Sequence, residues 1–276
     1  MPELPEVETI KNDLRPRLEG RRITSVSILW PRMVLGSSPE DILLRLTGRT
    51  IEEVDRRGKY LVLRLNGGEL LLLHMRMTGS LLLRDTLDAG PERYVTAVLG
   101  LDNGRELLFC DRRKLGTIAL ARDESALDGK LGPEPFEPRF TPDVLRERLT
   151  RRKGPIKSVL CNQKFIAGIG NMYADEALFL AGIHPKRPAG GLTDAEVAKL
   201  HAAIRTVLET GIGNGGATFS DYRRPDGARG EQQNAFYVAH RGGETCKICS
   251  TPIKRIPLNG RGTYFCPACQ AASTCS

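Results

Sequence analysis

The chain has 276 residues, 40% of them hydrophobic, and a formal net charge of +8. It is long enough for one large or two ordinary domains, and it lacks both a signal-peptide pattern and an apolar run near the roughly 20 residues of a membrane span. We therefore expect a globular, cytoplasmic protein whose basic side chains bind a polyanion, with nucleic acid the first candidate.

The N-terminal half predicts a helix followed by a β-sandwich. Apolar residues recur at spacings of three and four from Leu4 to Leu18, which predicts a first helix with one apolar stripe. Pro16 could bend or end this helix early, and Gly20 is typical of a helix stop. A helix at 39–46, opened by Ser38, interrupts a series of short strands separated by Gly- and Asn-rich turns. The clearest strands are 60–65, 69–74, 94–101 and 106–111.

Beyond a proline cluster, the pattern becomes helical. The prolines between 132 and 138 predict a linker at 131–140. The helices that follow are predicted at 142–150, 156–161, 172–181 and 194–209, with Thr193 capping the last. The segment 211–230 is rich in Gly, Arg and Asp without periodicity, which predicts a mobile loop. The resulting fold class is α+β, with domains at 1–130, 141–235 and 236–276.

Four of the seven cysteines form two C-x2-C pairs separated by 16 residues. They are Cys246, Cys249, Cys266 and Cys269. This is the spacing of a zinc ribbon, and four thiolates on two tight turns fit one tetrahedral, structural Zn²⁺ ion. A disulfide framework is the alternative, and the lack of a signal peptide disfavours it. Of the others, Cys110 and Cys161 lie in apolar surroundings and are predicted to be buried packing residues, and Cys275 lies in a polar tail.

Pro2 and Glu3 stand at the start of the chain. Removal of Met1, which is usual before a small residue, would leave Pro2 with a free secondary amine. Such an amine can attack a carbonyl-like carbon and form a cationic iminium. An ordinary α-amino group titrates near 8, so roughly a tenth is unprotonated at neutral pH, and Glu3 is placed to transfer protons. The alternative is that both residues only start a helix, since Pro and acids favour a first turn.

A glycine-rich turn precedes Asn171 at the start of a predicted helix. Backbone N–H groups of the stretch 168–170, together with Asn171, are suited to bind a phosphate. Lys157, upstream, could serve the same phosphate. The alternative is a plain corner between two helices.

Several predicted turns carry residues suited to contact with DNA, although each also has a plainer interpretation. Lys59 precedes a strand, at an edge where a loop could present it, but most such lysines are only solvated. Met77 follows His74 in a tight turn, where it is either core filler or an exposed apolar wedge. Arg113 stands in a run of three cations before Leu115, a combination that suits insertion into a base stack, although a solvated basic turn is the commoner case. Finally, Arg261 lies between glycines at the expected tip of the cysteine-bound hairpin, where it could reach a groove or phosphate or form only a flexible surface turn.

Together these motifs resemble the formamidopyrimidine-DNA glycosylase family of bacterial base-excision repair. The residues that carry the resemblance are 2–8, 58–60, 74–80, 113–116, 169–171 with Tyr173, and 260–262 within the four-cysteine finger. They cover nearly the whole chain in the order that the family has. The resemblance implies an N-terminal β-sandwich, a helical domain with a helix–two-turn–helix, and a zinc finger, which agrees with the domains predicted above.

The resemblance also implies an enzyme with both DNA glycosylase and AP lyase activity. A monomer would bind double-stranded DNA that contains oxidised bases or abasic sites in the bacterial cytoplasm, and would evert 8-oxoguanine or a formamidopyrimidine. Pro2 would attack C1′ of the damaged nucleotide, Glu3 would protonate the sugar, and β,δ-elimination would follow. Segment 215–232 would close over the everted base, with Ser220 and Tyr222 as candidate contacts.

The remaining site residues are assigned through the same resemblance. Those expected to hold phosphates around the lesion are Lys59, His74, Lys157, Asn171 and Arg261. The cation of Lys59 would also favour the neutral, nucleophilic Pro2 amine. Those expected to fill the void left by the everted base are Met77, Arg113 and Leu115. Leu115 stands where the family often has Phe, so it can wedge between base pairs but not stack on them.

Three alternatives remain open at this point. The related endonuclease VIII group uses the same proline–glutamate chemistry on oxidised pyrimidines, although the stretch 4–8 and the long loop favour the purine enzyme. A zinc-ribbon DNA-binding protein without catalysis explains the charge and the cysteines but leaves Pro2 and Lys59 unexplained. A tautomerase-like general base at Pro2 would leave the helical domain and the finger without a purpose.

Overall fold

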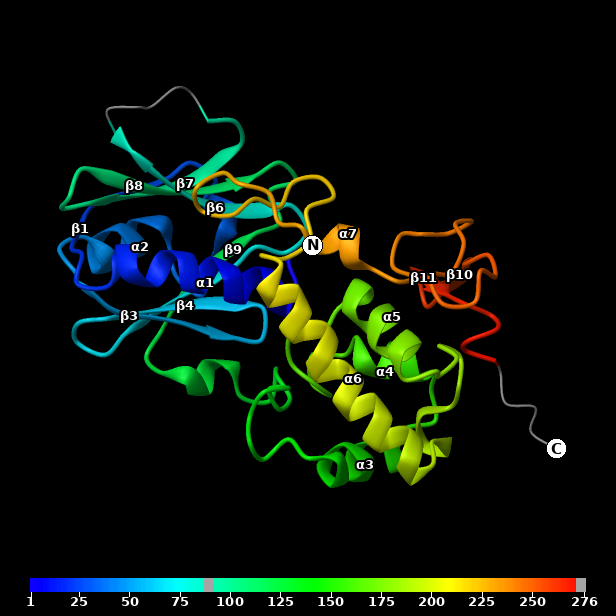
Figure 1. The fold of residues 1–276 in the computed structure, drawn as a ribbon. Helices are drawn as coiled ribbons and strands as arrows, with labels where there is room; N and C mark the ends of the chain where they lie inside the picture. Colours follow the sequence, from blue (N-terminus) through cyan, green and yellow to red (C-terminus); the bar gives the residue numbers. More distant parts are fainter. Residues whose placement is uncertain (87–91, 272–276) are drawn as a thin grey trace. The chain divides into compact units, whose positions relative to one another are not determined.

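The computed structural model describes residues 1–86 and 92–271, and the chain forms two compact units (Figure 1). The first unit combines Met1–Asp128 with the later segment Ile212–Gln233, and the second combines Gly129–Gly211 with the chain from Asn234 onward. The predicted division differs in two respects. Segment 212–233 belongs with the N-terminal residues, and the cysteine-bearing segment belongs with the helices. Cys275 lies outside the described residues.

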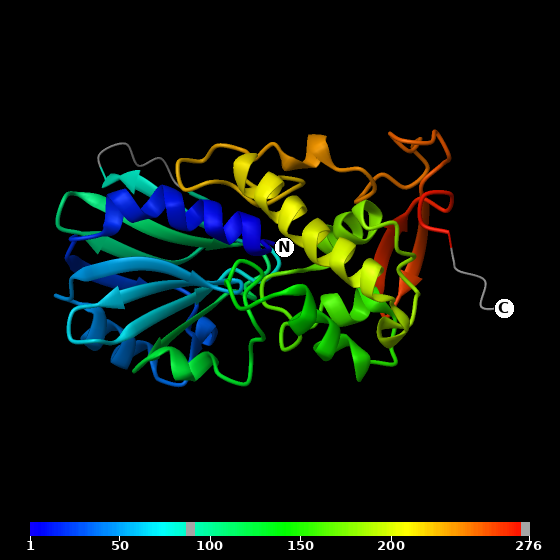
Figure 2. The ribbon, with the colours of Figure 1, turned by 60° about the horizontal axis from the view of Figure 1, so that its bottom comes forward.

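The first unit contains two β-sheets (Figure 2). One sheet has the order β1-β7-β8-β6 and is antiparallel throughout. Its strands are β1 (Ile23–Ile28), β6 (Gly79–Asp85), β7 (Val95–Leu101) and β8 (Arg105–Asp111). The other has the order β2-β9-β5-β4-β3, in which only the β2–β9 pair is parallel. Its strands are β2 (Val34–Leu35), β3 (Ile51–Arg57), β4 (Tyr60–Leu65), β5 (Leu70–His74) and β9 (Thr117–Ala121).

Both sheets and the first helix share one hydrophobic core. Helix α1 (Leu4–Leu18) buries an apolar stripe, and α2 (Pro39–Leu46) buries Ile42 and Leu46 in the same cluster. The sheets contribute buried side chains such as Leu61, Leu63, Leu73, Leu99, Leu107 and Phe109. The prediction of a helix packed with a β-sandwich is therefore confirmed. Pro16 does not end α1, because the burial of Leu14 and Leu18 on either side of it favours a continuous helix.

The second unit is helical and ends in a β-hairpin. Its helices are α3 (Pro142–Thr150), α4 (Ile156–Leu160), α5 (Asn171–Leu180), α6 (Asp194–Gly213), whose last residues enter the first unit, and α7 (Gln232–Ala235), which begins there. The hairpin consists of β10 (Lys254–Leu258) and β11 (Arg261–Phe265). Short 3-10 turns occur at Pro31–Met33 and Glu124–Leu127 in the first unit and at Ala189–Gly191 in the second. Within the described residues, no helix has the combined length and apolar character that crossing a membrane requires.

Five strands in the described part of the first unit were missing from the list of clear strands, namely β1, β2, β3, β6 and β9. Strand β3 carries charged residues over most of its length, and only Ile51 and Val54 are fully buried. Strand β6 begins at Gly79, a residue type that weakens a strand signal. Pairing with neighbours, rather than local preference, makes both segments strands.

Candidate active site

The start of α1 places Pro2 and Glu3 inside the first unit. Both residues are buried, and Glu3 is 1% exposed. Glu3 and Glu6 form a capping box in which the Glu3 N–H donates to Glu6 Oε2 at 2.7 Å. The structure includes Met1, so the Pro2 nitrogen is part of a peptide bond here. The second oxygen of Glu6 accepts the Ala217 N–H at 2.8 Å, so the predicted catalytic end of the chain and the 212–233 segment share one carboxylate.

Lys59 and His74 lie at the same end of neighbouring strands. Lys59 occupies a two-residue turn between β3 and β4, in which Gly58 adopts a φ of 58° that favours glycine. Tyr60 pairs with His74 across β4 and β5, and their rings meet edge to face with centroids 4.5 Å apart. The Lys59 side chain is largely buried. The register thus brings two of the predicted phosphate-binding residues close together in the fold.

His74 is neutral at physiological pH. Burial, together with the positive charges of Arg76 and Lys59, lowers the pKa of His74 to about 3. Its Nδ1 accepts the backbone N–H of Arg76 at 3.0 Å, so the proton of the neutral ring resides on Nε2. The side chain can therefore donate one hydrogen bond to an anion without carrying a charge.

The three predicted void-filling residues project from two adjoining turns of the first unit. Met77 follows β5, and Arg113 and Leu115 follow β8. Met77 is 44% exposed and Leu115 is 42% exposed. Met77 is therefore not part of the core, which leaves the wedge interpretation of this residue.

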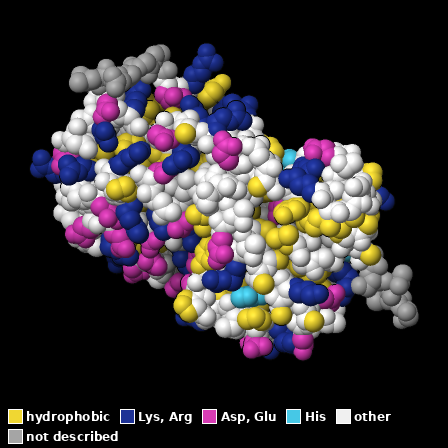
Figure 3. All heavy atoms as spheres, in the orientation of Figure 1, with side chains coloured by type: hydrophobic (Ala, Val, Ile, Leu, Met, Phe, Trp, Pro, Cys, Tyr) yellow, Lys and Arg dark blue, Asp and Glu magenta, His cyan; other side chains and the backbone are white. Residues whose placement is uncertain are grey.

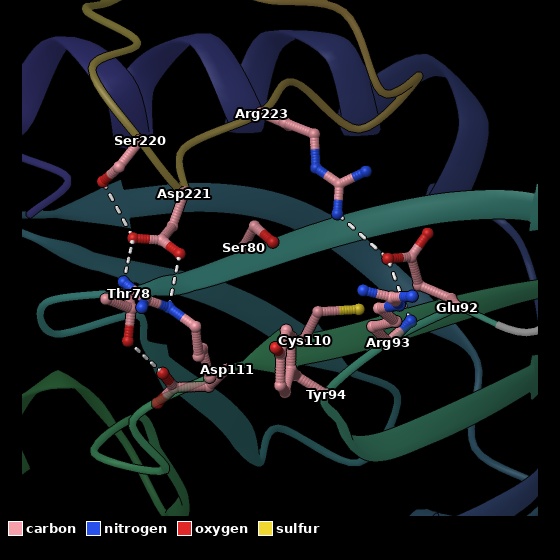
Figure 4. A pocket seen from close by; sticks show the side chains of 11 residues that line it. Thr78, Ser80, Glu92, Arg93, Tyr94, Cys110, Asp111, Ser220, Asp221 and Arg223 are labelled. Carbon is pink, nitrogen blue, oxygen red and sulfur yellow. Dashed lines mark hydrogen bonds and ion pairs between the residues drawn. The ribbon is translucent and has the colours of Figure 1, made fainter.

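A hollow of about 350 Å³ lies beside these turns (Figure 4). Residues of the β6 and β8 edge and of the 212–233 segment line it, among them Thr78, Ser80, Cys110, Asp111 and Ser220. The sequence predicted a mobile loop at 211–230, and in the structure ion pairs attach this loop to the sandwich. Arg112 binds both carboxylate oxygens of Asp221 at 3.0 and 3.1 Å, and Arg223 binds Glu92 at 3.0 Å.

Of the two candidate base contacts in this loop, only Ser220 lines the hollow. Tyr222 is 6% exposed and packs into the sandwich core. Its hydroxyl donates to the Gly215 carbonyl at 3.0 Å, and burial raises the pKa of Tyr222, so it stays protonated. Tyr222 therefore anchors the loop instead of facing a ligand.

The second unit holds the other predicted DNA contacts. Asn171 is the first residue of α5, and its Nδ2 donates to the Gly262 carbonyl in the hairpin at 2.9 Å. Arg261 pairs with Leu258 at the tip of the hairpin, and its side chain is exposed. The Asn171 amide and the exposed Arg261 guanidinium thus belong to one assembly of helix end and hairpin tip.

Lys157 has a different place from the one predicted. It is 2% exposed, and its ammonium group donates to Asp175 Oδ2 at 2.9 Å, the Gly262 carbonyl at 3.1 Å and Thr263 Oγ1 at 2.9 Å. An ammonium group has three donors, and these acceptors use them all. The buried ion pair therefore holds the hairpin against α5, and no donor remains for a phosphate.

The four paired cysteines form a metal site. Their sulfurs lie within 4.8 Å of one another, and three of the separations are 3.4, 3.5 and 3.9 Å. Ligands about 2.3 Å from a tetrahedral zinc ion lie roughly 3.8 Å apart, so the arrangement fits one Zn²⁺. Cys110 is different, because burial raises the pKa of its thiol to about 11. Cys161, half-buried, donates to the Gly170 carbonyl at 3.5 Å.

Comparison with family models accounts for most of the chain. Residues 1–118 match the formamidopyrimidine-DNA glycosylase N-terminal domain, residues 131–223 match the H2TH domain of the same enzyme, and residues 243–272 match a zinc finger found in FPG and IleRS. The three models follow one another along the chain. The chain belongs to the formamidopyrimidine-DNA glycosylase family. Its four-cysteine site is the family's structural zinc site.

Relatives and solved structures of this glycosylase family match along the full length. Formamidopyrimidine-DNA glycosylases of Chloroflexus aurantiacus and Symbiobacterium thermophilum are each 47% identical to this chain over 98% of its length. The matched region covers 98% of the Chloroflexus protein and 89% of the Symbiobacterium protein. A mutant of Lactococcus lactis FPG in complex with Fapy-dG-containing DNA is 37% identical with a TM-score of 0.92, and Lactococcus lactis Fpg with abasic-site DNA has a TM-score of 0.90. Both cover 98% of this chain and 100% of the compared chain.

Each unit also contains buried acidic residues that sequence reasoning did not assign to a site. Asp175 and Glu176 are both buried in α5. Glu176 accepts backbone N–H groups of three successive residues, 237–239, at 2.8 to 2.9 Å. In the first unit, Glu6 and Asp111 play comparable roles. Asp111 had a sequence signal, since an Asp at the end of a strand before a turn often accepts backbone N–H groups. Glu6 also had one, because an acid three residues after the N-cap residue is typical of a capping box. Asp175 and Glu176 had none.

Lys and Arg side chains lie among Asp and Glu side chains over the face drawn in Figure 3. The net charge of +8 is thus not gathered into one continuous basic surface on that face.

Proposed function

We propose that this chain removes oxidised purines, including 8-oxoguanine and formamidopyrimidines, from duplex DNA and then cleaves the abasic site. The proposal rests on one observation above all. Pro2 and Glu3 begin the buried N-terminal turn of a chain whose identity of 47% to formamidopyrimidine-DNA glycosylases extends over 98% of its length. The Lactococcus lactis complexes with Fapy-dG and abasic-site DNA support the substrate class.

The reaction starts at the Pro2 nitrogen after Met1 has been removed. The amine attacks C1′ of the damaged nucleotide and loses its proton, while the base departs with the electrons of the glycosidic bond and takes up a proton from solvent. Glu3 then protonates O4′ as the C1′–O4′ bond breaks, which opens the sugar ring and leaves an iminium between Pro2 and C1′. The resulting iminium acidifies the C2′ proton. Its removal expels the 3′ phosphate, a second elimination expels the 5′ phosphate, and water then releases the sugar fragment from Pro2. Zinc takes no part in these steps and stabilises the finger.

The other residues bind and shape the DNA. We assign Lys59, His74, Asn171 and Arg261 to phosphates near the lesion, with the Lys59 cation also favouring the neutral Pro2 amine. Lys157 is assigned to holding the hairpin that carries Arg261. The void left by the everted base is filled by Met77, Arg113 and Leu115.

The hollow beside the two turns is the proposed site for the everted base. Its volume of about 350 Å³ exceeds what a purine base needs, and Ser220 on its wall offers a hydroxyl. The relatives come from bacteria, which supports action on bacterial chromosomal DNA. The family resemblance implies that the enzyme acts as a monomer.

Borohydride capture tests the proposal. Protein from which Met1 has been removed, incubated with a duplex containing 8-oxoguanine opposite cytosine, should form a covalent adduct that mass spectrometry locates on the Pro2 nitrogen. A preparation that retains Met1 is the control and should form none. No adduct with processed protein would favour a DNA-binding module, and an adduct on Lys59 would overturn the assigned nucleophile.

A second substrate separates this proposal from the endonuclease VIII group. Excision of 8-oxoguanine should be faster than excision of thymine glycol from otherwise identical duplexes. The reverse order would make oxidised pyrimidines the substrates while leaving the Pro2 chemistry in place.

A further inference from the structure

Asp111 ends strand β8 with a carboxylate that is almost wholly enclosed, since the residue is 1% exposed. One oxygen accepts the Thr78 hydroxyl and the Arg113 N–H, the latter at 3.1 Å. The other accepts the N–H groups of Leu115 at 2.7 Å and Gly116 at 2.6 Å. A single buried side chain therefore determines the path of the whole 112–116 turn.

The same carboxylate joins this turn to the one that carries Met77. Thr78 directly follows Met77, and its hydroxyl both donates to Asp111 and accepts the Arg113 N–H at 3.2 Å. Figure 4 shows Thr78 and Asp111 meeting at the edge of the hollow. Met77, Arg113 and Leu115 are thus connected through one hydrogen-bonded centre, although they come from separate turns.

Both turns are packed so closely that their glycines leave no room for a side chain. A Cβ on Gly116 would lie 2.5 Å from the Phe109 ring, and one on Gly79 would lie 2.5 Å from the Met75 carbonyl oxygen. Lys114 adopts a φ of 56° in the left-handed region. The hydrogen bonds to Asp111 offset the cost of that conformation.

We infer that Asp111 is a positioning residue that sets Met77, Arg113 and Leu115 as one rigid wedge. This inference rests on the proposed function. Asp111 borders the hollow, but it is 1% exposed and both of its carboxylate oxygens already accept hydrogen bonds from the two turns, so it acts through the turns that it holds. Three side chains held at fixed separations enter a base stack together. Independent turns would lose conformational entropy each time the protein bound DNA.

Two substitutions test the inference from either side of the shared hydrogen bond. Asp111→Asn replaces one carboxylate oxygen with an NH₂ group, which cannot accept a hydrogen bond. Thr78→Val replaces the hydroxyl with a methyl group of similar size. Asp85→Asn is the matched control. Asp85 also ends a strand, β6, and pairs with Arg105 at the opposite end of the β6–β8 ladder. Its side chain is 51% exposed, so the substitution breaks no buried contact. Thr78→Ser restores the hydroxyl.

Single-turnover excision of 8-oxoguanine from a duplex should be at least about tenfold slower in Asp111→Asn and Thr78→Val, since small misplacements of positioned groups have effects of that size. Borohydride capture of a pre-formed abasic site, which needs no base eversion, should stay within about twofold of the parent. The double variant should be no slower than the slower single variant, because both break one unit. Thr78→Ser should recover most of the rate, and Asp85→Asn should match the parent.

Trp30 gives a readout that does not depend on activity. It is the only tryptophan in the chain, and Lys114 Nζ lies 4.3 Å from its ring centroid. If the 112–116 turn is released, Lys114 leaves the indole, and iodide quenching of the fluorescence should change in Asp111→Asn but not in Asp85→Asn.

Parental excision rates in both test variants would overturn the inference, as would an equal loss of abasic-site capture, which would indicate damage to the fold. If Asp111→Asn fails to fold, Thr78→Val decides the question alone. Failure of the parent protein to capture abasic-site DNA would instead contradict the proposed function.

Discussion

Replacing Lys157 by Met removes the ammonium group from the α5–hairpin junction and leaves the Asp175 carboxylate without its buried partner. The two side chains are 2% and 1% exposed. Removing one member of such a pair typically costs about 3–5 kcal/mol, because the remaining charge stays out of water. At about 3 °C per kcal/mol for a unit of this size, the melting temperature of the second unit should fall by roughly 10 °C.

The destabilisation of this variant relative to the parent should also depend on pH. Burial already raises the pKa of Asp175 to about 7, and the nearby Lys157 ammonium opposes that rise. Without Lys157 the pKa rises further, so Asp175 is neutral at pH 5.5 and loses its proton only at a higher pH than in the parent. The destabilisation should therefore be smaller at pH 5.5 than at pH 8, which thermal melts at the two pH values would show.

DNA binding distinguishes a hairpin anchor from a phosphate contact. We expect Lys157→Met to weaken binding to lesion duplex, and the added change Asp175→Asn to restore much of both stability and binding, because it removes the unpaired charge and keeps an acceptor for the Tyr264 N–H. A phosphate contact could not be restored in this way. If Lys157→Met melts like the parent but lowers the salt slope of binding by about 1, our assignment of Lys157 is refuted.

Three further predictions concern DNA contact, metal and pH. Arg261→Ala, at the exposed hairpin tip, should leave the melting temperature unchanged and lower by about 1 the slope of log binding constant against log salt concentration for lesion duplex. An affinity that is unchanged at every salt concentration would show that Arg261 does not contact the DNA. Chelation of zinc should abolish DNA binding while the far-UV dichroism of the β-sandwich persists, and added Zn²⁺ should restore binding. The pKa of His74 is about 3 in the folded state and 6.5 in the unfolded state, so the folded state binds fewer protons between these pH values. The contribution of His74 to stability is therefore complete above pH 6.5 and is lost as the pH falls toward 3. His74→Gln should flatten the urea-unfolding midpoint between pH 6.5 and 4, and an unchanged pH profile would contradict the buried neutral ring.

The amino-acid sequence alone predicted those features whose residues lie close together along the chain. Two C-x2-C pairs can serve one zinc ion with little help from the rest of the fold, and a helical repeat of apolar residues identifies α1 even across Pro16. Pro2 and Glu3 are adjacent in sequence, so their pairing as candidate nucleophile and acid needed no tertiary information. The family resemblance then supplied roles for residues whose individual patterns were ambiguous.

Tertiary structure decided which polar groups face solvent and which are buried. Lys157 and Arg261 are both cations near glycines in the sequence, yet one is enclosed by Asp175 and Thr263 and the other is exposed. Burial of a charge depends on partners 18 and 106 residues away, and no local pattern encodes such distances. For the same reason the role of Asp111 became visible only when β6 and β8 paired and brought its carboxylate to Thr78.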